Sequence, residues 1–297
     1  MEFVLTIAAP QRGGLTGAIV AEAAGALNGL GAETATADWL SEEEAADIAF
    51  QGTDPATAEA ALRDVLSDRP LDLIAQPAAG RRKRLMLADM DATIVTSETL
   101  DELAAHAGVK DKISAITARA MNGELDFAGA VKERVGMLAG LSEAMLDETY
   151  REIELTGGAE TLVKTMRADG AHCVLVSGGF KYFTSRVAES CGFHEDHANQ
   201  FTIVDGRLTG KVVEPIQGKD AKLQTLLRLT RELELAPSDT LAVGDGANDL
   251  PMIEAAGLGI AFHGKPLVAA AARARVDHGD LTALLFFQGY RRTEFSL

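Results

Sequence analysis

Two carboxylates, Asp89 and Asp91, stand two positions apart directly after the apolar segment 85–88. A continuous apolar segment of this kind is typical of a buried parallel strand. Because alternate residues of an extended chain share a face, the strand end would present both carboxylates to the crevice in which open α/β sheets bind ligands. One could attack a phosphorus atom while the other serves the leaving oxygen. Like charges this close need a cation to stay ionised, so the pattern predicts metal-assisted phosphoryl transfer.

Two later segments carry groups that bind phosphate. The apolar segment 173–176 ends at Ser177 and Gly178, whose hydroxyl and amide can hold phosphate oxygens. Lys222 opens an amphipathic segment, and its ammonium is a compact positive charge suited to phosphate. By itself Ser177 could mark only a turn. At the end of a second strand, and beside the first, it favours a phosphate site.

A third strand-like segment, 240–244, leads into a further group of polar residues that contains Asp245, Asn248 and Asp249. Two carboxylates in such a position could simply cap a helix. Together with Asp89 and Asp91, Asp245 forms an oxygen-only set, which is the ligand type that a hard cation such as Mg²⁺ prefers. The sequence therefore predicts a magnesium site at the ends of these strands.

In their order and spacing these segments resemble the four motifs of the haloacid dehalogenase superfamily of phosphatases, over about residues 84–290. Within that superfamily, the segments 98–104, 121–127 and 132–135 resemble the phosphoserine phosphatase family. The resemblance implies Mg²⁺-dependent hydrolysis of L-phosphoserine to L-serine and phosphate, the last step of serine biosynthesis. It also implies a covalent aspartyl-phosphate intermediate.

The resemblance assigns a role to each matching residue. Asp89 would be the nucleophile and Asp91 the general acid and base. Mg²⁺ would be bound by Asp89, the backbone carbonyl of Asp91, and Asp245. The phosphate and substrate would be bound by Glu98, Arg134, Ser177, Gly178, Lys222 and Asn248, with Asp249 supporting them from behind.

Some positions near these motifs have a second interpretation. Glu98 and Arg134, expected to meet the ammonium and carboxylate of the substrate, could instead be ordinary charges on a helix surface. Phe127 is expected in the core rather than in the site. Ala92 stands where the family usually has serine, and we expect this change to lower activity or leave it unaltered.

The fold class expected for residues 81–297 is α/β, with a doubly wound, mostly parallel sheet. Between the first core strand and residue 156 the pattern has helical periodicity and glycine punctuation, which predicts an inserted helical cap over about residues 96–155. A hairpin is expected around Asp205-Gly206. His194 and His197 show no metal-ligand pairing with cysteine and are expected in loops or on the surface.

Residues 1–80 are expected to form a separate α+β domain with the order βαββαβ. This segment resembles the ferredoxin-like ACT modules that bind amino acids, so an amino-acid effector is one expectation. A packing or homodimerisation module without a ligand is the alternative, since a fold does not imply a function. The basic segment 80–84 is expected to be a solvated linker.

Composition limits the classes of function. The formal net charge of −16 over 297 residues argues against nucleic acid as a partner. The N-terminal segment lacks the pattern of a secretory signal, and no apolar segment reaches membrane-spanning length. Two cysteines, Cys173 and Cys191, suit a reducing compartment, so a cytoplasmic enzyme without membrane contact is expected.

Three other functions share parts of this pattern. One is a capped phosphatase or phosphotransferase of the same superfamily that acts on a different phosphate ester. Another is a signalling receiver domain, which also uses an acceptor aspartate but would be shorter and would lack the cap. The third is an amino-acid sensor without catalysis that uses only the first segment.

Overall fold

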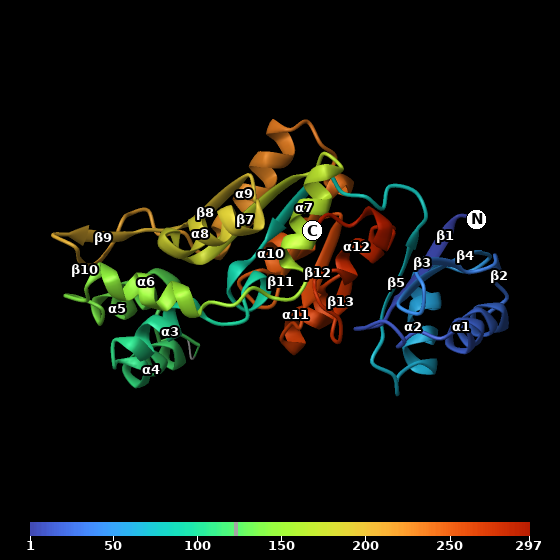
Figure 1. The fold of residues 1–297 in the computed structure, drawn as a ribbon, viewed down its shortest axis with the longest axis horizontal. Helices are drawn as coiled ribbons and strands as arrows, with labels where there is room; N and C mark the ends of the chain where they lie inside the picture. Colours follow the sequence, from blue (N-terminus) through green and yellow to red (C-terminus); the bar gives the residue numbers. More distant parts are fainter. Residues whose placement is uncertain (122–123) are drawn as a thin grey trace.

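Two sheets of different kinds organise the molecule, and Figure 1 shows them along its long axis with a group of helices at the far end. The computed structural model describes residues 1–121 and 124–297. An antiparallel sheet occupies the N-terminal end, and a parallel sheet lies between it and the helical group. In the described ranges, no helix has the length and apolar character needed to cross a membrane.

The N-terminal segment follows the expected order βαββαβ, except that the second expected strand is divided into the two short strands β2 and β3. The sheet has the strand order β2-β4-β1-β5, with β3 paired to β4, and all its pairs are antiparallel. Its elements are β1 (Phe3–Ala8), α1 (Gly17–Gly29), β2 (Glu33–Thr34), β3 (Asp38–Ser41), β4 (Ala45–Gln51), α2 (Pro55–Val65) and β5 (Asp72–Pro77). Alternate residues of β1 face the two helices: Leu5 and Ile7 pack with Leu27 of α1 and Leu62 of α2 and form the core of this segment.

The central sheet is entirely parallel, which confirms the expected α/β core. Its order is β13-β12-β11-β6-β7-β8. The strands are β6 (Leu85–Ala88), β7 (His172–Phe180), β8 (Glu195–Asn199), β11 (Thr240–Gly244), β12 (Leu258–Phe262) and β13 (Ala274–Val276). Because Ala88 pairs with Leu175 on one side and with Val243 on the other, the polar residues at the carboxyl ends of these three strands emerge at one edge.

Helices cover both faces of this sheet. Met86 and Cys173 pack with one set of helices, while Leu85 and Val174 pack with the other. The first set is α7 (Ala159–Ala168), α8 (Lys181–Cys191) and α12 (Ala283–Phe287). The second set is α9 (Lys219–Glu232), α10 (Leu250–Ala255) and α11 (Pro266–Ala271). The strand residues point alternately to the two faces, so a strand apolar along its whole length is buried on both.

The chain between β6 and α7 forms the helical group at the end of the molecule. It begins after the single turn η1 (Met90–Ile94), and Val95 pairs with Leu155 where the chain leaves and returns. Its helices are α3 (Thr99–His106), α4 (Lys110–Met121), α5 (Phe127–Gly136) and α6 (Glu143–Glu152). Asn122 and Gly123 of the expected motif lie outside the described residues.

The expected hairpin lies beside these helices. It consists of β9 (Phe201–Val204) and β10 (Arg207–Val212), joined through Asp205-Gly206. It extends away from the parallel sheet toward α5 and α6 (Figure 1). A bridge between Ser142 and Arg207 ties it to the start of α6, so the helical group receives a second segment from much later in the chain.

The sequence analysis missed both edge strands of the parallel sheet, β8 and the three-residue β13. β8 carries His197, which was expected in a loop or on the surface, and its pattern Glu-Asp-His-Ala-Asn is almost wholly polar. β8 is an edge strand with partly exposed side chains, so the apolar pattern of a central strand does not apply. His197 is paired with Glu195 at 2.8 Å, and the ring of His194 stacks on that of His172.

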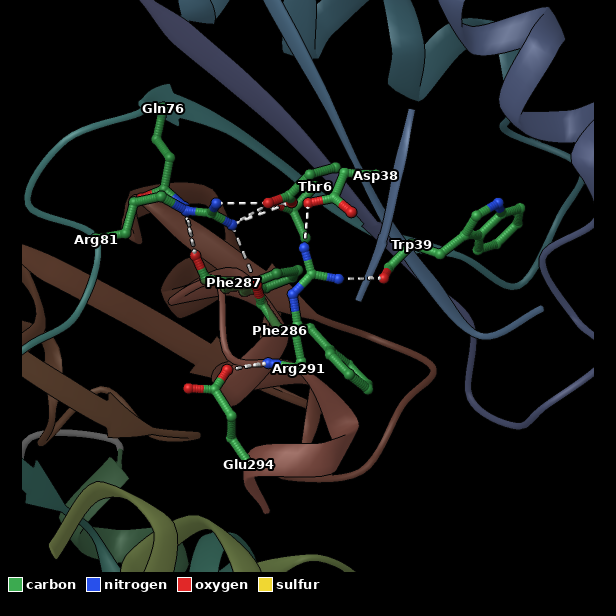
Figure 2. Close-up of polar contacts among 10 residues, drawn as sticks. Thr6, Asp38, Trp39, Gln76, Arg81, Phe286, Phe287, Arg291 and Glu294 are labelled. Carbon is green, nitrogen blue, oxygen red and sulfur yellow. Dashed lines mark hydrogen bonds and ion pairs between the residues drawn. The ribbon is translucent and has the colours of Figure 1, made fainter. Parts of the chain in front are cut away.

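The expectation of a solvated basic linker is wrong for Arg81 and Lys83. Arg81 is 12% exposed, and its guanidinium donates to the carboxylate of Asp47 at 2.6 Å and to Thr6 Oγ1 at 2.8 Å. Figure 2 shows that it also donates to the backbone carbonyls of Phe286 and Phe287, so it joins the first sheet to the end of the chain. Composition cannot reveal such burial, because the acceptors come from distant parts of the sequence.

We expect Arg81→Met to lower the free energy of unfolding by about 3–5 kcal/mol, because Asp47 would be left buried without its counter-ion. The measurement is urea unfolding followed by the fluorescence of Trp39, the single tryptophan, which lies at the same junction. Arg12→Met is the control, because Arg12 and its partner Glu42 are 71% and 77% exposed; its effect should stay below about 1 kcal/mol. Equal losses for both variants would contradict the prediction.

Candidate active site

The polar residues at the ends of β6, β7 and β11 line one cavity of about 530 Å³. Eight of the ten predicted site residues line it: Asp89, Asp91, Glu98, Arg134, Ser177, Gly178, Asp245 and Asn248. The other two, Lys222 and Asp249, are buried beneath it. Lys222 contacts Asp89 directly, and Asp249 contacts Lys222. Thus all ten predicted residues come together, because adjacent parallel strands release the chain at one sheet edge while the helical group closes over it.

Lys222 lies at the base of this cavity between two carboxylates. Its Nζ is 2.6 Å from Asp89 Oδ1 and 2.5 Å from Asp249 Oδ1. Burial alone would lower the pKa of Lys222, but the two carboxylates outweigh it and raise that pKa, so the ammonium stays charged. The second oxygen of Asp249 accepts the N–H of Gly246 at 3.0 Å. Asp249 is therefore fixed as the partner of Lys222.

A set of carboxylate oxygens suited to a cation lies beside Lys222. Asp89, Asp245 and Asp249 each offer one oxygen, and these oxygens lie within 4.8 Å of one another. Desolvation, and then the charge of Asp249, raise the pKa of Asp89 well above its usual range, while Lys222 acts in the opposite direction. One ammonium does not neutralise three carboxylates. An oxygen-only set with excess negative charge fits a hard divalent cation such as Mg²⁺.

The structure also distinguishes among these carboxylates. Both oxygens of Asp249 already have partners, so Asp89 and Asp245 are better placed to give an oxygen to a metal. Asp245 has a cationic neighbour, since Lys265 Nζ lies 3.5 Å from Asp245 Oδ2. Lys265 lines the cavity and was missed by the sequence analysis. No local pattern marks it, because an exposed lysine before a short helix is common.

Asp91 is held in a different setting from Asp89. One of its oxygens accepts the N–H of Thr99 at 2.9 Å, and the other faces Ser177 Oγ at 3.4 Å. Desolvation raises the pKa of Asp91, and the Thr99 N–H opposes this shift. A raised pKa favours the protonated carboxyl, which is the form that a general acid needs. The two strand-end carboxylates therefore have separate environments suited to separate tasks.

The helical group contributes one anion and one cation to the opposite wall. Glu98 precedes α3, and Arg134 lies on α5 with its Nε donating to the carbonyl of Ala130 at 3.3 Å. Both line the cavity, so the alternative that they are ordinary surface charges does not describe their position. Desolvation lowers the pKa of Arg134, while the charges of Asp101 and Glu98 oppose that shift.

Two further side chains near the site differ from or refine the expectation. Phe127 was expected in the core, but it is 38% exposed and lines the cavity. Its ring covers Gly178 and Gly218, where a Cβ atom would lie 3.4 Å and 3.1 Å away. Ala92 has φ +53°, a left-handed conformation that is uncommon for a residue with a Cβ atom, and it lines a separate cavity. The expectation that alanine there lowers activity or leaves it unaltered stays a prediction.

A sequence model of the haloacid dehalogenase-like hydrolases matches residues 86–254, which include the residues that follow all three strand ends. The chain belongs to this family. Curated proteins similar to this chain include phosphoserine phosphatases. That of Streptomyces coelicolor is 40% identical over 253 residues, which are 84% of this chain and 62% of the relative. That of Lactococcus lactis is 42% identical over 205 residues, which are 69% of this chain and 95% of the relative.

The structural comparison extends over nearly the whole chain. A HAD family hydrolase from Salmonella enterica serovar Typhi superposes with a TM-score of 0.83 at 28% identity, covering 97% of this chain and 98% of that protein. The chain spans about three fifths of the length of the first curated relatives, namely 62%, 63% and 58%.

Glu98 provides a pH-dependent prediction for the metal-free protein. Partial desolvation, then the charges of Asp91 and Asp245, raise the pKa of its carboxyl from 4.5 to about 7. Because the pKa of this acid is higher in the folded state, protonated Glu98 stabilises the fold; that contribution is complete below about pH 4.5 and is lost as the pH rises through about 7.

We therefore expect the thermal unfolding midpoint of the wild type to fall relative to that of Glu98→Gln as the pH rises from about 5 to 8, because glutamine does not ionise. Calorimetric scans with chelator measure this difference. Glu102→Gln, on the same helix but not lining the cavity, is the control and should follow the wild type. Parallel curves for the wild type and Glu98→Gln would contradict the assignment.

Proposed function

We propose that the protein hydrolyses L-phosphoserine to L-serine and phosphate. The observation that carries the proposal is the single cavity in which a phosphoryl-transfer set on the strand ends faces Glu98 and Arg134. A substrate with an α-ammonium and an α-carboxylate beside its phosphate needs one anion and one cation in the same cavity as the groups that act on the phosphate. The names of the relatives, phosphoserine phosphatases at 40% and 42% identity, support the same substrate.

In the first half of the reaction, a carboxylate oxygen of Asp89 attacks the phosphorus atom and the bond between phosphorus and the serine oxygen breaks. Asp91 gives its proton to the leaving alkoxide, so serine departs as a neutral alcohol. Lys222, Ser177 and the backbone N–H of Gly178 hold the phosphate oxygens, while Asn248 supports the substrate from the neighbouring loop. Ser177 is positioned for this task because its oxygen accepts the N–H of Gly179 at 2.8 Å.

In the second half, water attacks the phosphorus atom of the aspartyl-phosphate while Asp91 takes one of its protons. The bond to Asp89 breaks, phosphate leaves, and both carboxyl groups return to their starting states. Asp89, the backbone carbonyl of Asp91, and Asp245 would hold Mg²⁺, with Asp249 supporting them through Lys222. When bound, Mg²⁺ supplies positive charge against the phosphate oxygens and the excess carboxylate charge.

The domain assignment belongs to the same proposal. Residues 81–297 form the phosphatase domain. Within it, about residues 96–155 act as a cap that excludes water from the site and carries the groups that select the substrate. Residues 1–80 form a ferredoxin-like domain of the ACT-like kind, supported by the strand order β2-β4-β1-β5 and two covering helices. An amino-acid effector and a homodimer stay predictions for this domain. The free, buried Cys173 and Cys191 support a cytoplasmic enzyme.

The deciding experiment is phosphate release from a panel of phosphomonoesters, with added MgCl₂ and with chelator. L-phosphoserine should give the highest kcat/KM, above phosphothreonine, sugar phosphates and nucleotides. Chelation should stop turnover reversibly. A preference for a sugar or nucleotide phosphate would retain the phosphatase chemistry but refute the substrate.

Asp89→Asn should abolish turnover by at least about 10⁴-fold, because an amide cannot act as the nucleophilic carboxylate. Initial rates on L-phosphoserine measure the loss, and an unchanged circular dichroism spectrum shows that the variant is folded. The wild type quenched in acid during turnover should carry phosphate on Asp89, detected by mass spectrometry. Absence of that adduct together with an active Asp89→Asn variant would exclude the covalent mechanism.

Arg134→Ala should reduce kcat/KM for L-phosphoserine by about 10- to 150-fold, which corresponds to the loss of one charged hydrogen bond of about 1.5–3 kcal/mol. The same variant should change kcat/KM for p-nitrophenyl phosphate much less, since that substrate has no carboxylate. Arg119→Ala is the matched control, because Arg119 is a cap arginine that pairs with Glu133 at 2.7 Å and does not line the cavity. Equal losses on both substrates would show that Arg134 does not read the amino-acid part.

A further inference from the structure

A carboxylate from the first sheet is inserted into the catalytic half of the molecule. Asp72, the first residue of β5, is only 2% exposed. Its oxygens accept the backbone N–H groups of Asp277 at 2.7 Å, His278 at 3.2 Å and Gly279 at 2.7 Å. Desolvation raises the pKa of Asp72 and these donors act in the opposite direction, as expected of a carboxylate seated in a turn of converging amides.

The turn 277–279, which Asp72 holds, is also hydrogen-bonded to the loop that follows β12. Residues 277–279 come directly after β13, the edge strand of the parallel sheet. The backbone N–H of His263 donates to the carbonyl of Val276 at 2.8 Å. The imidazole Nε2 of His263 lies 2.9 Å from the carbonyl oxygen of Gly279, which can only accept, so this nitrogen donates. His263 is therefore held at both its backbone and its side chain.

From His263 the connection continues to the metal-binding set. Two residues later, the backbone N–H of Lys265 donates to the carbonyl of Asp245 at 3.0 Å, and its ammonium lies 3.5 Å from Asp245 Oδ2. Asp245 lines the active-site cavity. Hydrogen bonds thus connect Asp72 in the first domain to the turn 277–279 and the turn to His263, the backbone continues from His263 to Lys265, and a further hydrogen bond connects Lys265 to Asp245.

The opposite side of the same turn is open. His263, His278 and Gly279 line a cavity of about 440 Å³ that also reaches Pro10 of the first domain and Ala92 beside Asp91. Side-chain packing therefore does not hold the turn from that side. The turn is restrained by the three hydrogen bonds to Asp72, a residue about 200 positions earlier in the chain, together with the bond from His263 to Gly279 and the ion pair between Arg275 and Asp277.

We propose that Asp72 is a positioning residue for the active site: it orients the turn 277–279 and, through His263 and Lys265, the carboxylate of Asp245. The first domain then completes the catalytic half physically, in addition to any regulatory role. The magnesium and substrate parts of this inference rest on the proposed function. Groups that orient a metal ligand from outside commonly change metal affinity when they are removed, by about 10-fold or more.

The test uses full-length Asp72→Asn, which keeps the size of the side chain but replaces one acceptor oxygen with a donor that faces another N–H. Titration with MgCl₂ by isothermal calorimetry should show magnesium bound about tenfold more weakly, without any substrate present. The kcat for L-phosphoserine at fixed magnesium should fall, while KM at saturating magnesium should stay near the wild-type value. Asp38→Asn is the control, since it removes a pair with Arg291 across the same junction but does not touch the turn, and magnesium affinity should not change.

His263→Ala interrupts the next step of the series without altering the junction, and it keeps the test decisive if Asp72→Asn folds poorly. It should weaken magnesium binding to a similar extent, and the double variant should be no weaker than His263→Ala alone. Unchanged magnesium affinity in both single variants, even with a lower unfolding midpoint, would reduce Asp72 to a structural contact and overturn the proposal. If the wild type does not hydrolyse phosphoserine but both variants still weaken magnesium binding, the substrate assignment fails and the positioning role stands.

Discussion

The active site depends on one buried ammonium. Lys222 is surrounded by protein and contacts Asp89 and Asp249, so the charges of these carboxylates can exist in the interior only because it is there. With Asp245 nearby, the set still carries more negative than positive charge, and this excess makes the place suitable for a divalent cation. The backbone must approach closely for this arrangement, since a Cβ atom on Gly244 would collide with the side chain of Asp249.

Chemistry and selectivity come from different parts of the chain. Under the proposed function, the strand ends supply the groups that act on phosphorus, and the strands that carry them, β6 and its neighbours, are buried on both faces. The helical group supplies Glu98, Arg134 and Phe127, which contact the cavity from the other side. Under the proposed function, a change in the helical group would alter which phosphate ester is accepted while the phosphoryl-transfer set stays the same.

The junction between the two halves is built from buried polar residues on one face of the first sheet. Thr6, Asp47, Asp72 and Gln76 all point away from α1 and α2, and each is less than a tenth exposed. Arg81 donates to Asp47 and Thr6 (Figure 2), and Gln76 donates to the carbonyl of Phe287. Asp72 accepts the backbone N–H groups of the turn 277–279. Buried polar groups of this kind require particular partners in particular directions, so they define one relative placement of the two halves where an apolar contact would tolerate several.

Local pattern was sufficient for the parts of this protein in which neighbouring residues decide the outcome. The apolar segments before Asp89, Ser177 and Asp245 define buried parallel strands, and the rule that such strands end at one edge brings ten predicted residues together. Helical periodicity likewise predicts the helical insertion over about residues 96–155, where the structure has α3 to α6; Asn122 and Gly123 lie outside the described residues.

Other features were decided only by the tertiary structure. Arg81 was expected in a solvated linker, His197 in a loop or on the surface, and Phe127 in the core, while Lys265 was not identified at all. In each case the environment is created by residues far away in the chain: the acceptors of Arg81 include carbonyl groups 205 and 206 positions later. Sequence by itself determines the strands and helices that have a clear apolar pattern, because that pattern depends on periodicity along the chain. The edge strands β8 and β13 lack it and form only by pairing with their neighbours. Which polar side chains are buried, and against what, depends on contacts between segments that only the folded chain brings together.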